Sequence, residues 1–167
     1  ARNWSKIGDD LVGEAQDDHF GHDVSLSADG KIVASGGRRN DGSASNAGNV
    51  MVFEYSNSSW SQLGNDIDGE AENDYLGQPH GGVVISGNGK IVAVAASYND
   101  GAGTNAGQVR VFQNNNGSWS QLGDDIEGEA ARDRAGAQKS ISLSDDGLTL
   151  AVGFPLNDDS GTNYGKV

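Results

Sequence analysis

The chain has 167 residues, which is long enough for one domain with a hydrophobic core. Its 26 glycines and 2 prolines favour a sheet protein with many turns over a helical bundle, because glycine inside a helix costs about 1 kcal/mol relative to alanine. The formal net charge of −13 disfavours nucleic-acid binding, the lack of cysteine excludes disulfides and thiolate chemistry, and no apolar run reaches the ~20 residues of a membrane span.

One segment occurs three times along the chain. Residues 60–71 read WSQLGNDIDGEA, and the same pattern stands at residues 4–15 and 119–130. The three tryptophans that open these segments are 56 and 59 residues apart. Such spacing predicts a single array over residues 1–167, in which one supersecondary unit is repeated. The approximate units are 4–59, 60–118 and 119–167, the last of them incomplete.

Each unit is predicted to contain four short strands. The first, at residues 23–27, alternates apolar and polar side chains, and the second, at 31–35, is almost continuously apolar, as expected of a strand buried on both faces. The Asp29-Gly30 pair between them predicts a hairpin with a two-residue type I′ turn, and Asn88-Gly89 and Asp146-Gly147 predict the same in the later units. The equivalent first strands are 82–86 and 140–144, and the equivalent second strands are 90–95 and 148–152.

A loop rich in Gly, Asn and Ser follows each second strand. It opens on an Asn-Asp pair that is expected to form a turn rather than to bind a ligand. These pairs are Asn40-Asp41, Asn99-Asp100 and Asn157-Asp158. The third strand is predicted at residues 50–55 and again at 109–113, and the fourth lies around 60–63. No helical periodicity of useful length is found.

Four antiparallel strands in a repeat of 56 to 59 residues match one blade of a β-propeller. Small residues on the second strands, such as Ala34 and Gly36, suit the crowded axis of that fold. The fold class expected is therefore all-β, with three four-stranded antiparallel propeller-type blades. They would form a partial propeller or part of a larger or oligomeric ring. A β-solenoid or a pair of sandwiches is the competing all-β interpretation.

Several motifs of the first unit resemble the FG-GAP repeats of integrin α-chain propellers and of their microbial and algal relatives. The resemblance is carried by Phe20-Gly21, residues 24–27, Asp29-Gly30, residues 40–42 and residues 48–53. It covers the whole chain, although the Phe-Gly pair itself stands only in the first copy. The later copies have Leu76-Gly77 and Ala135-Gly136 at that place.

The resemblance also implies that calcium is a possible cofactor, because family propellers often hold it in loops of the form DxDxDGxxxD. No such loop stands in this sequence, and calcium needs six to eight oxygen ligands. The nearest candidate ligands are Asp66, Asp68 and Glu70, together with Asp124, Asp125, Glu127 and Glu129. The favoured interpretation is instead that the Glu of each connection caps backbone N–H groups.

Three N-glycosylation sequons point to a location. They begin at Asn3, Asn57 and Asn116, and the last two occupy the same place in their units. Use of these sequons would mean a secretory origin, so the chain is expected to be extracellular or at the cell surface. Chance sequons are also common in a sequence this rich in Asn and Ser.

Motifs that carry catalysis are not found. His19, His22 and His80 have no metal-binding spacing, and no nucleophile elbow or phosphate loop occurs. The chain is therefore predicted not to be an enzyme. The expected function is an extracellular interaction or adhesion module that binds a protein or a glycan. The alternatives are a structural subunit of an extracellular fibre or coat and a non-catalytic propeller domain of a larger secreted enzyme.

Three units are too few to close a propeller, which typically has about 4–8 blades. The chain also opens without an apolar leader, as expected of a mature product, a fragment or the observed part of something longer. Three arrangements are therefore expected as alternatives: part of a longer chain, two copies in a six-bladed ring, or copies joined head to tail.

Overall fold

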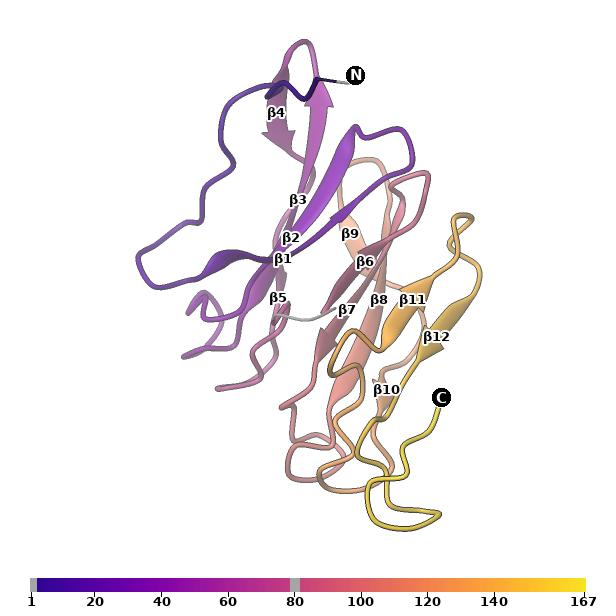
Figure 1. Ribbon diagram of the computed structural model, residues 1–167. Coiled ribbons are helices and arrows are strands. Elements are labelled where there is room, and N and C mark those ends of the chain that lie inside the picture. The colour runs from indigo at the N-terminus through magenta and orange to yellow at the C-terminus, as the bar shows by residue number, and fades with distance from the viewer. Residues whose placement is uncertain (1–2, 79–81) are drawn as a thin grey trace.

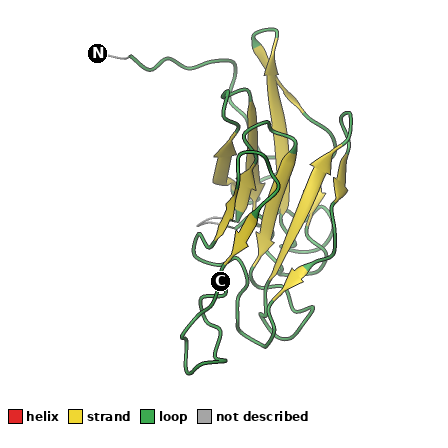
Figure 2. Ribbon diagram, turned by 90° about the vertical axis from the view of Figure 1, so that its right-hand side faces the viewer, coloured by secondary structure: helices red, strands yellow, loops and turns green. Residues whose placement is uncertain are grey.

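A computed structural model describes residues 3–78 and 82–167 and shows an all-β fold. Within these ranges there is no helix, and the strands form three antiparallel sheets, none of which closes on itself (Figure 2). The expected fold class is thus confirmed at the all-β level. Residues 79–81, which include His80, lie outside the described part of the chain.

The first two sheets have the same organisation. The first holds β1 (Phe20–Leu26), β2 (Ile32–Gly37), β3 (Asn49–Ser56), β4 (Ser59–Gln62) and β5 (Ile67–Asp68). The second holds β6 (Val83–Ile85), β7 (Ile91–Ala96), β8 (Gln108–Asn114), β9 (Trp119–Gln121) and β10 (Ile126–Glu127). The third consists of β11 (Ile141–Leu143) and β12 (Leu150–Val152). Neighbouring strands follow the order β1-β2-β3-β4, and equivalently β6-β7-β8-β9.

The prediction of four strands in every sheet is wrong, because the described residues form sheets of five, five and two strands. The outer edge of β3 carries two short strands end to end: β4 pairs with residues 53–56, and β5 pairs with Asn49 and Val50. The chain leaves this edge between them through Gly64, whose φ of +84° is readily adopted only by glycine. Strands of two residues give no periodic signal, which is why the sequence did not reveal β5 and β10.

The sheets are also out of phase with the units counted from the tryptophans. Strand β4 spans the boundary between units 4–59 and 60–118, yet it pairs with β3 of the preceding unit. Strand β9 pairs with β8 in the same way. The second and third tryptophan segments therefore complete the sheets before them, and the connection that follows each one leads the chain into the next sheet.

The three Asp-Gly or Asn-Gly hairpins form as predicted, but the type I′ turn is not found. In the first hairpin Gly30 N–H donates to Ser27 O (3.0 Å), and only Gly30 of the Asp29-Gly30 pair has a positive φ, +74°. Asp29 Oδ1 accepts hydrogen bonds from Ser27 Oγ and from the Lys31 amide instead. The loop is thus five residues long, because these side-chain hydrogen bonds stabilise a wider turn.

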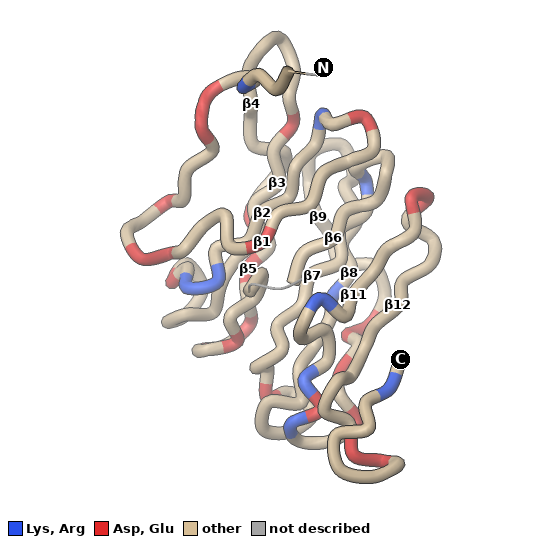
Figure 3. Tube along the Cα trace, in the orientation of Figure 1, with Lys and Arg blue, Asp and Glu red and all other residues tan. Residues whose placement is uncertain are grey.

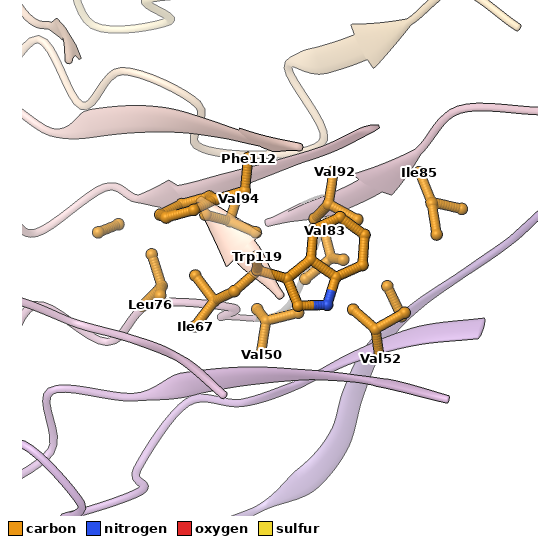
Figure 4. Close-up of a cluster of buried hydrophobic side chains, with 12 residues drawn as sticks. Val50, Val52, Ile67, Leu76, Val83, Ile85, Val92, Val94, Phe112 and Trp119 are labelled. Atoms are coloured by element: carbon orange, nitrogen blue, oxygen red, sulfur yellow. The ribbon is translucent and has the colours of Figure 1, made fainter. Parts of the chain in front are cut away.

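The sheets lie side by side in chain order and bury their facing sides (Figure 1). One cluster joins the first two sheets and places Trp119 among Val50, Val52 and Val92 (Figure 4). A second cluster joins β7 and β8 to the third sheet. All six residues of β7 are buried, since this strand is covered on both faces. The prediction of a strand buried on both faces is confirmed for β7, whereas Ala151 on β12 is exposed.

Backbone hydrogen bonds also hold the units in register. The amide of Ala28 donates to Gly87 O (2.9 Å), and the amide of Gly87 donates to Asp145 O (2.9 Å). These three residues occupy equivalent positions in consecutive hairpins. The interface between units is therefore a repeated structural feature and not an accidental contact.

Candidate functional site

A cavity of about 420 Å³ opens among loops at one end of the sheets. Two of these loops follow β2 and β7, and the other two precede β6 and β11. The polar side chains that dominate its lining are Arg38, Arg39, Tyr75, Gln78, Tyr98 and Arg134. We refer to this cavity as the loop pocket.

Tight turns after the second strands present part of the loop pocket. Asn40 N–H donates to Gly37 O (2.9 Å), so Arg38 and Arg39 stand at the tip of a four-residue turn. The equivalent bond from the Asn99 amide to Ala96 O (3.0 Å) places Ser97 and Tyr98 at the tip of the next turn.

The connections that lead into β6 and β11 supply the other side chains that line the loop pocket. Tyr75 and Arg134 each lie fifteen residues after the tryptophan of their unit and have φ values of +54° and +53°. His19, the equivalent residue of the first unit, has φ +57°. A positive φ is uncommon for residues other than glycine, and its recurrence shows that the connections share one backbone conformation.

A buried Asp–Asn pair locks each connection to the neighbouring turn. Asn99 Nδ2–H donates to Asp74 Oδ2 (3.0 Å), and the same oxygen accepts the amide of Ala71 (3.0 Å). Asp74 precedes Tyr75 and Asn99 follows Tyr98, so this pair fixes both tyrosines. Burial raises the pKa of Asp74, while the hydrogen bonds from Asn99 and Ala71 oppose that rise.

The same pair recurs in the other two units, as Asn40 with Asp18 (3.2 Å) and Asn157 with Asp133 (3.0 Å). The Asp of each connection, not the Glu expected from the sequence, therefore caps the backbone. The asparagines do form turns as predicted, since Asn99 Oδ1 accepts the amide of Gly101 (2.8 Å).

Aromatic and cationic side chains pack together inside the loop pocket. The rings of Tyr75 and Tyr98 meet edge to face with centroids 5.6 Å apart. The Arg134 guanidinium carbon lies 4.4 Å from the centroid of the Tyr98 ring, and its Nη1 donates to Tyr98 Oη at 3.3 Å. Such contacts hold long side chains in one conformation, so much of the site is already ordered without a ligand.

The loop pocket is basic although the protein is acidic. Three of the six arginines in the chain, Arg38, Arg39 and Arg134, line this pocket, although the net charge of the chain is −13. Acidic residues are spread over loops around the molecule, and basic residues are few (Figure 3). The ion pairs found among the described residues involve Lys6, Arg110 and Lys166, and none includes these three arginines.

Arg38 carries a further signal. Its Nε–H is shielded from solvent, yet it has no hydrogen-bond partner among the residues that the structure describes. A buried donor on a cation is costly when no acceptor meets it. Because this Nε–H is shielded, it is not itself open to a ligand. The loop pocket instead offers the positive charge of its arginines, which no ion pair within the described residues neutralises.

The acids predicted as metal ligands lie on the short strands β5 and β10 or in the segments beside them, and several of them bind other side chains of the protein. Asn49 Nδ2–H donates to Asp66, and Gln108 Nε2–H donates to both Glu70 (2.9 Å) and Asp125 (3.0 Å). Glu129 forms an ion pair with Lys166. Burial and the charge of Asp66 raise the pKa of Asp68. Asp124 is exposed, and Glu127 is half-buried.

Within residues 3–78 and 82–167, no three His, Asp or Glu side chains are grouped so that they could hold a metal ion. Calcium binding stays a prediction.

The predicted sequon residues Asn3, Asn57 and Asn116 are all exposed, and Asn57 and Asn116 lie in the β3–β4 and β8–β9 hairpins. Their glycosylation likewise stays a prediction. The described residues contain no helix able to cross a membrane.

The fold is similar to that of solved structures, whereas the sequence has no recognised relatives among the proteins compared. No family model matches the chain, and no curated protein matches it in sequence. A crystal structure described as a "putative 6-phosphogluconolactonase" from Bacteroides uniformis is similar, with 15% identity and a TM-score of 0.48. The match covers 86% of this chain and 37% of that one, so the chain spans about a third of that protein's length.

The prediction that the chain is not an enzyme is corrected by this finding. It rested on absent sequence motifs, whereas the similar structure is itself described as an enzyme. At this TM-score the likeness assigns no reaction to the chain.

Sequence reasoning missed the residues of the loop pocket because it followed the positions that repeat. The position fifteen residues after the tryptophan holds His19, Tyr75 and Arg134 in the three units. The two residues at the tip of the turn after each second strand are Arg38-Arg39, Ser97-Tyr98 and Pro155-Leu156. Positions that differ between otherwise constant repeats were the available signal, because the constant residues build the frame on which these side chains stand.

Proposed function

We propose that the chain is an extracellular or cell-surface interaction module built of FG-GAP-like, propeller-type repeats, and that it binds its ligand in the loop pocket. The observation that carries the proposal is that equivalent loop positions of successive units line one cavity with side chains that differ from unit to unit. Binding sites are commonly placed on loops held by a rigid frame of strands. The exposed sequons support an extracellular location.

Equilibrium binding to a panel of neutral oligosaccharides, acidic oligosaccharides and peptides tests this proposal. At least one member is expected to bind saturably, and Tyr98→Ala is expected to weaken that binding about tenfold or more, because the ring contacts both Tyr75 and Arg134. Tyr164→Ala is the matched control, since Tyr164 is 75% exposed and lies outside the loop pocket.

Circular dichroism of each variant checks that its fold is retained. If no panel member binds, or if the two alanine variants weaken binding equally, the loop pocket is not a ligand site.

The alternative function, a structural subunit, is favoured by one separate observation. Val24 and Leu26 on β1 are 63% and 57% exposed, whereas the equivalent Val83 and Ile85 of β6 are 2% and 8% exposed against the preceding sheet. The first sheet thus presents a face of the kind that another unit covers elsewhere in the molecule. A second copy of the chain that packs there would give head-to-tail assembly.

A further inference from the structure

The charge of the loop pocket limits the size of any anionic partner. Arg38, Arg39 and Arg134 attract an acid group at short range, but the net charge of −13 repels an extended polyanion at longer range. A small ligand with a single acid group avoids this repulsion, because only its acid group has to approach the arginines.

The lining also suits a hydroxylated ring. Tyr75 and Tyr98 present apolar ring surface and hydroxyl groups, and Gln78 adds an amide that already donates to Ser97. Amide and hydroxyl groups can both donate and accept, which is what sugar hydroxyls require. The volume of about 420 Å³ lies within the usual range for small-molecule sites and accommodates a ligand of one or two sugar rings.

We infer that the loop pocket binds a small sugar that carries a carboxylate, an assignment that rests on the proposed binding function and specifies its ligand. The carboxylate accepts hydrogen bonds from the guanidinium groups of Arg38 and Arg39, which line the loop pocket and form no ion pair within the described residues. Guanidinium forks bind carboxylates through two parallel hydrogen bonds. The ring lies against the tyrosines.

Nearby acids do not compete for these arginines. The carboxylate of Asp74 turns inward to the Asn99 side chain and the Ala71 amide, and Asp133 turns in the same way to Asn157. The structure therefore keeps the acids closest in sequence to Tyr75 and Arg134 engaged beneath the site. The positive charge of the loop pocket remains available to a ligand.

A matched pair of ligands tests the inference. Glucuronate and glucose share one ring and differ in a carboxylate against a hydroxymethyl group, and acetate supplies the carboxylate without the ring. Titrations followed by NMR are expected to show glucuronate binding at least about tenfold more tightly than either glucose or acetate, because one charge-assisted contact is lost in glucose and the ring contacts are lost in acetate.

Variants locate the carboxylate. Arg38→Gln is expected to weaken glucuronate binding about tenfold and to leave glucose binding unchanged, because it removes only the charge-assisted contact. Arg38→Lys keeps the charge but not the fork, so its effect should be intermediate. Arg132→Gln is the matched control, since Arg132 is exposed on the connection that carries Arg134 but does not line the loop pocket.

The outcomes separate this inference from the proposed function. Equal binding of glucose and glucuronate, or equal binding of acetate and glucuronate, would overturn the acidic-sugar assignment and leave a functional pocket. If glucuronate does not bind but another member of the oligosaccharide and peptide panel does, and Tyr98→Ala weakens that binding, the acidic-sugar assignment fails while the proposed binding function stands. If nothing in that panel binds, the proposed function fails together with the inference.

Discussion

At the scale of single residues, the Asp–Asn pairs determine the geometry of the loop pocket. Asp74→Ala is expected to lower the free energy of unfolding by about 1–3 kcal/mol, because the buried amide of Asn99 loses its acceptor. Asp74→Asn keeps an oxygen acceptor and should lose less. Urea denaturation measures both. Glu72→Ala, an exposed change in the same connection, should stay within about 0.5 kcal/mol of the parent chain.

The pKa of Asp74 predicts a pH dependence with a definite sign. Burial raises this pKa above its ordinary value of 3.8, so the folded state binds the proton more tightly than the unfolded chain does. The resulting stabilisation is complete below 3.8 and is lost as the pH rises through the raised pKa. The stability of the parent chain relative to Asp74→Asn should therefore fall with rising pH in that window and then stay constant. A relative stability that rises with pH would contradict the assignment.

Close packing at Gly36 gives a second residue-scale prediction. A Cβ atom built there would lie 2.2 Å from Gly77 O, and backbone atoms cannot move aside cheaply. Gly36→Ala should therefore destabilise the chain by about 1–3 kcal/mol in thermal or urea unfolding. At Gly87 the nearest atom would be 3.1 Å away, and the equivalent residue of the first unit is Ala28. Gly87→Ala should cost clearly less, and equal losses would show that the contact at Gly36 is not limiting.

At the scale of strands and sheets, one tryptophan joins the first sheet to the second. Trp119 on β9 is 6% exposed, packs in the first core cluster and donates its indole N–H to Leu63 O (2.7 Å). Trp119→Ala should lower the free energy of unfolding by about 3–5 kcal/mol, which calorimetry or urea denaturation measures.

Trp4 is the matched control, because it holds the same place in the first repeat but is 98% exposed. Trp4→Ala should leave stability within about 0.5 kcal/mol. A similar loss in the two variants would mean that the interface between the sheets contributes little.

At the scale of the whole molecule, the open face of the first sheet predicts association. Light scattering over a range of concentrations is expected to show multiples of the 17.2 kDa chain. Leu26→Asp should shift the distribution toward single chains, because it places a charge on the face formed by β1. Leu148→Asp changes an 85% exposed hairpin residue and should have little effect. A constant mass of one chain at all concentrations would exclude assembly through this face.

The amino-acid sequence by itself determined the all-β class, the repeat and the approximate place of the main strands. Those features depend on short-range patterns: alternation in β1, the apolar run of β7 and the glycine of each hairpin. It did not reveal β5 and β10, the wider hairpin turns or the role of Asp74, because each depends on a partner far away in the chain or on a side-chain hydrogen bond.

The candidate site was decided only by the tertiary structure. Arg38, Tyr75, Tyr98 and Arg134 are scattered over almost a hundred residues, and nothing in their spacing shows that they meet. Stacking of the sheets brings equivalent loops of successive units to one end of the molecule, where these side chains line a single cavity. Periodic residues specify the frame through local physics, whereas the site arises because packing superimposes positions that differ between the repeats.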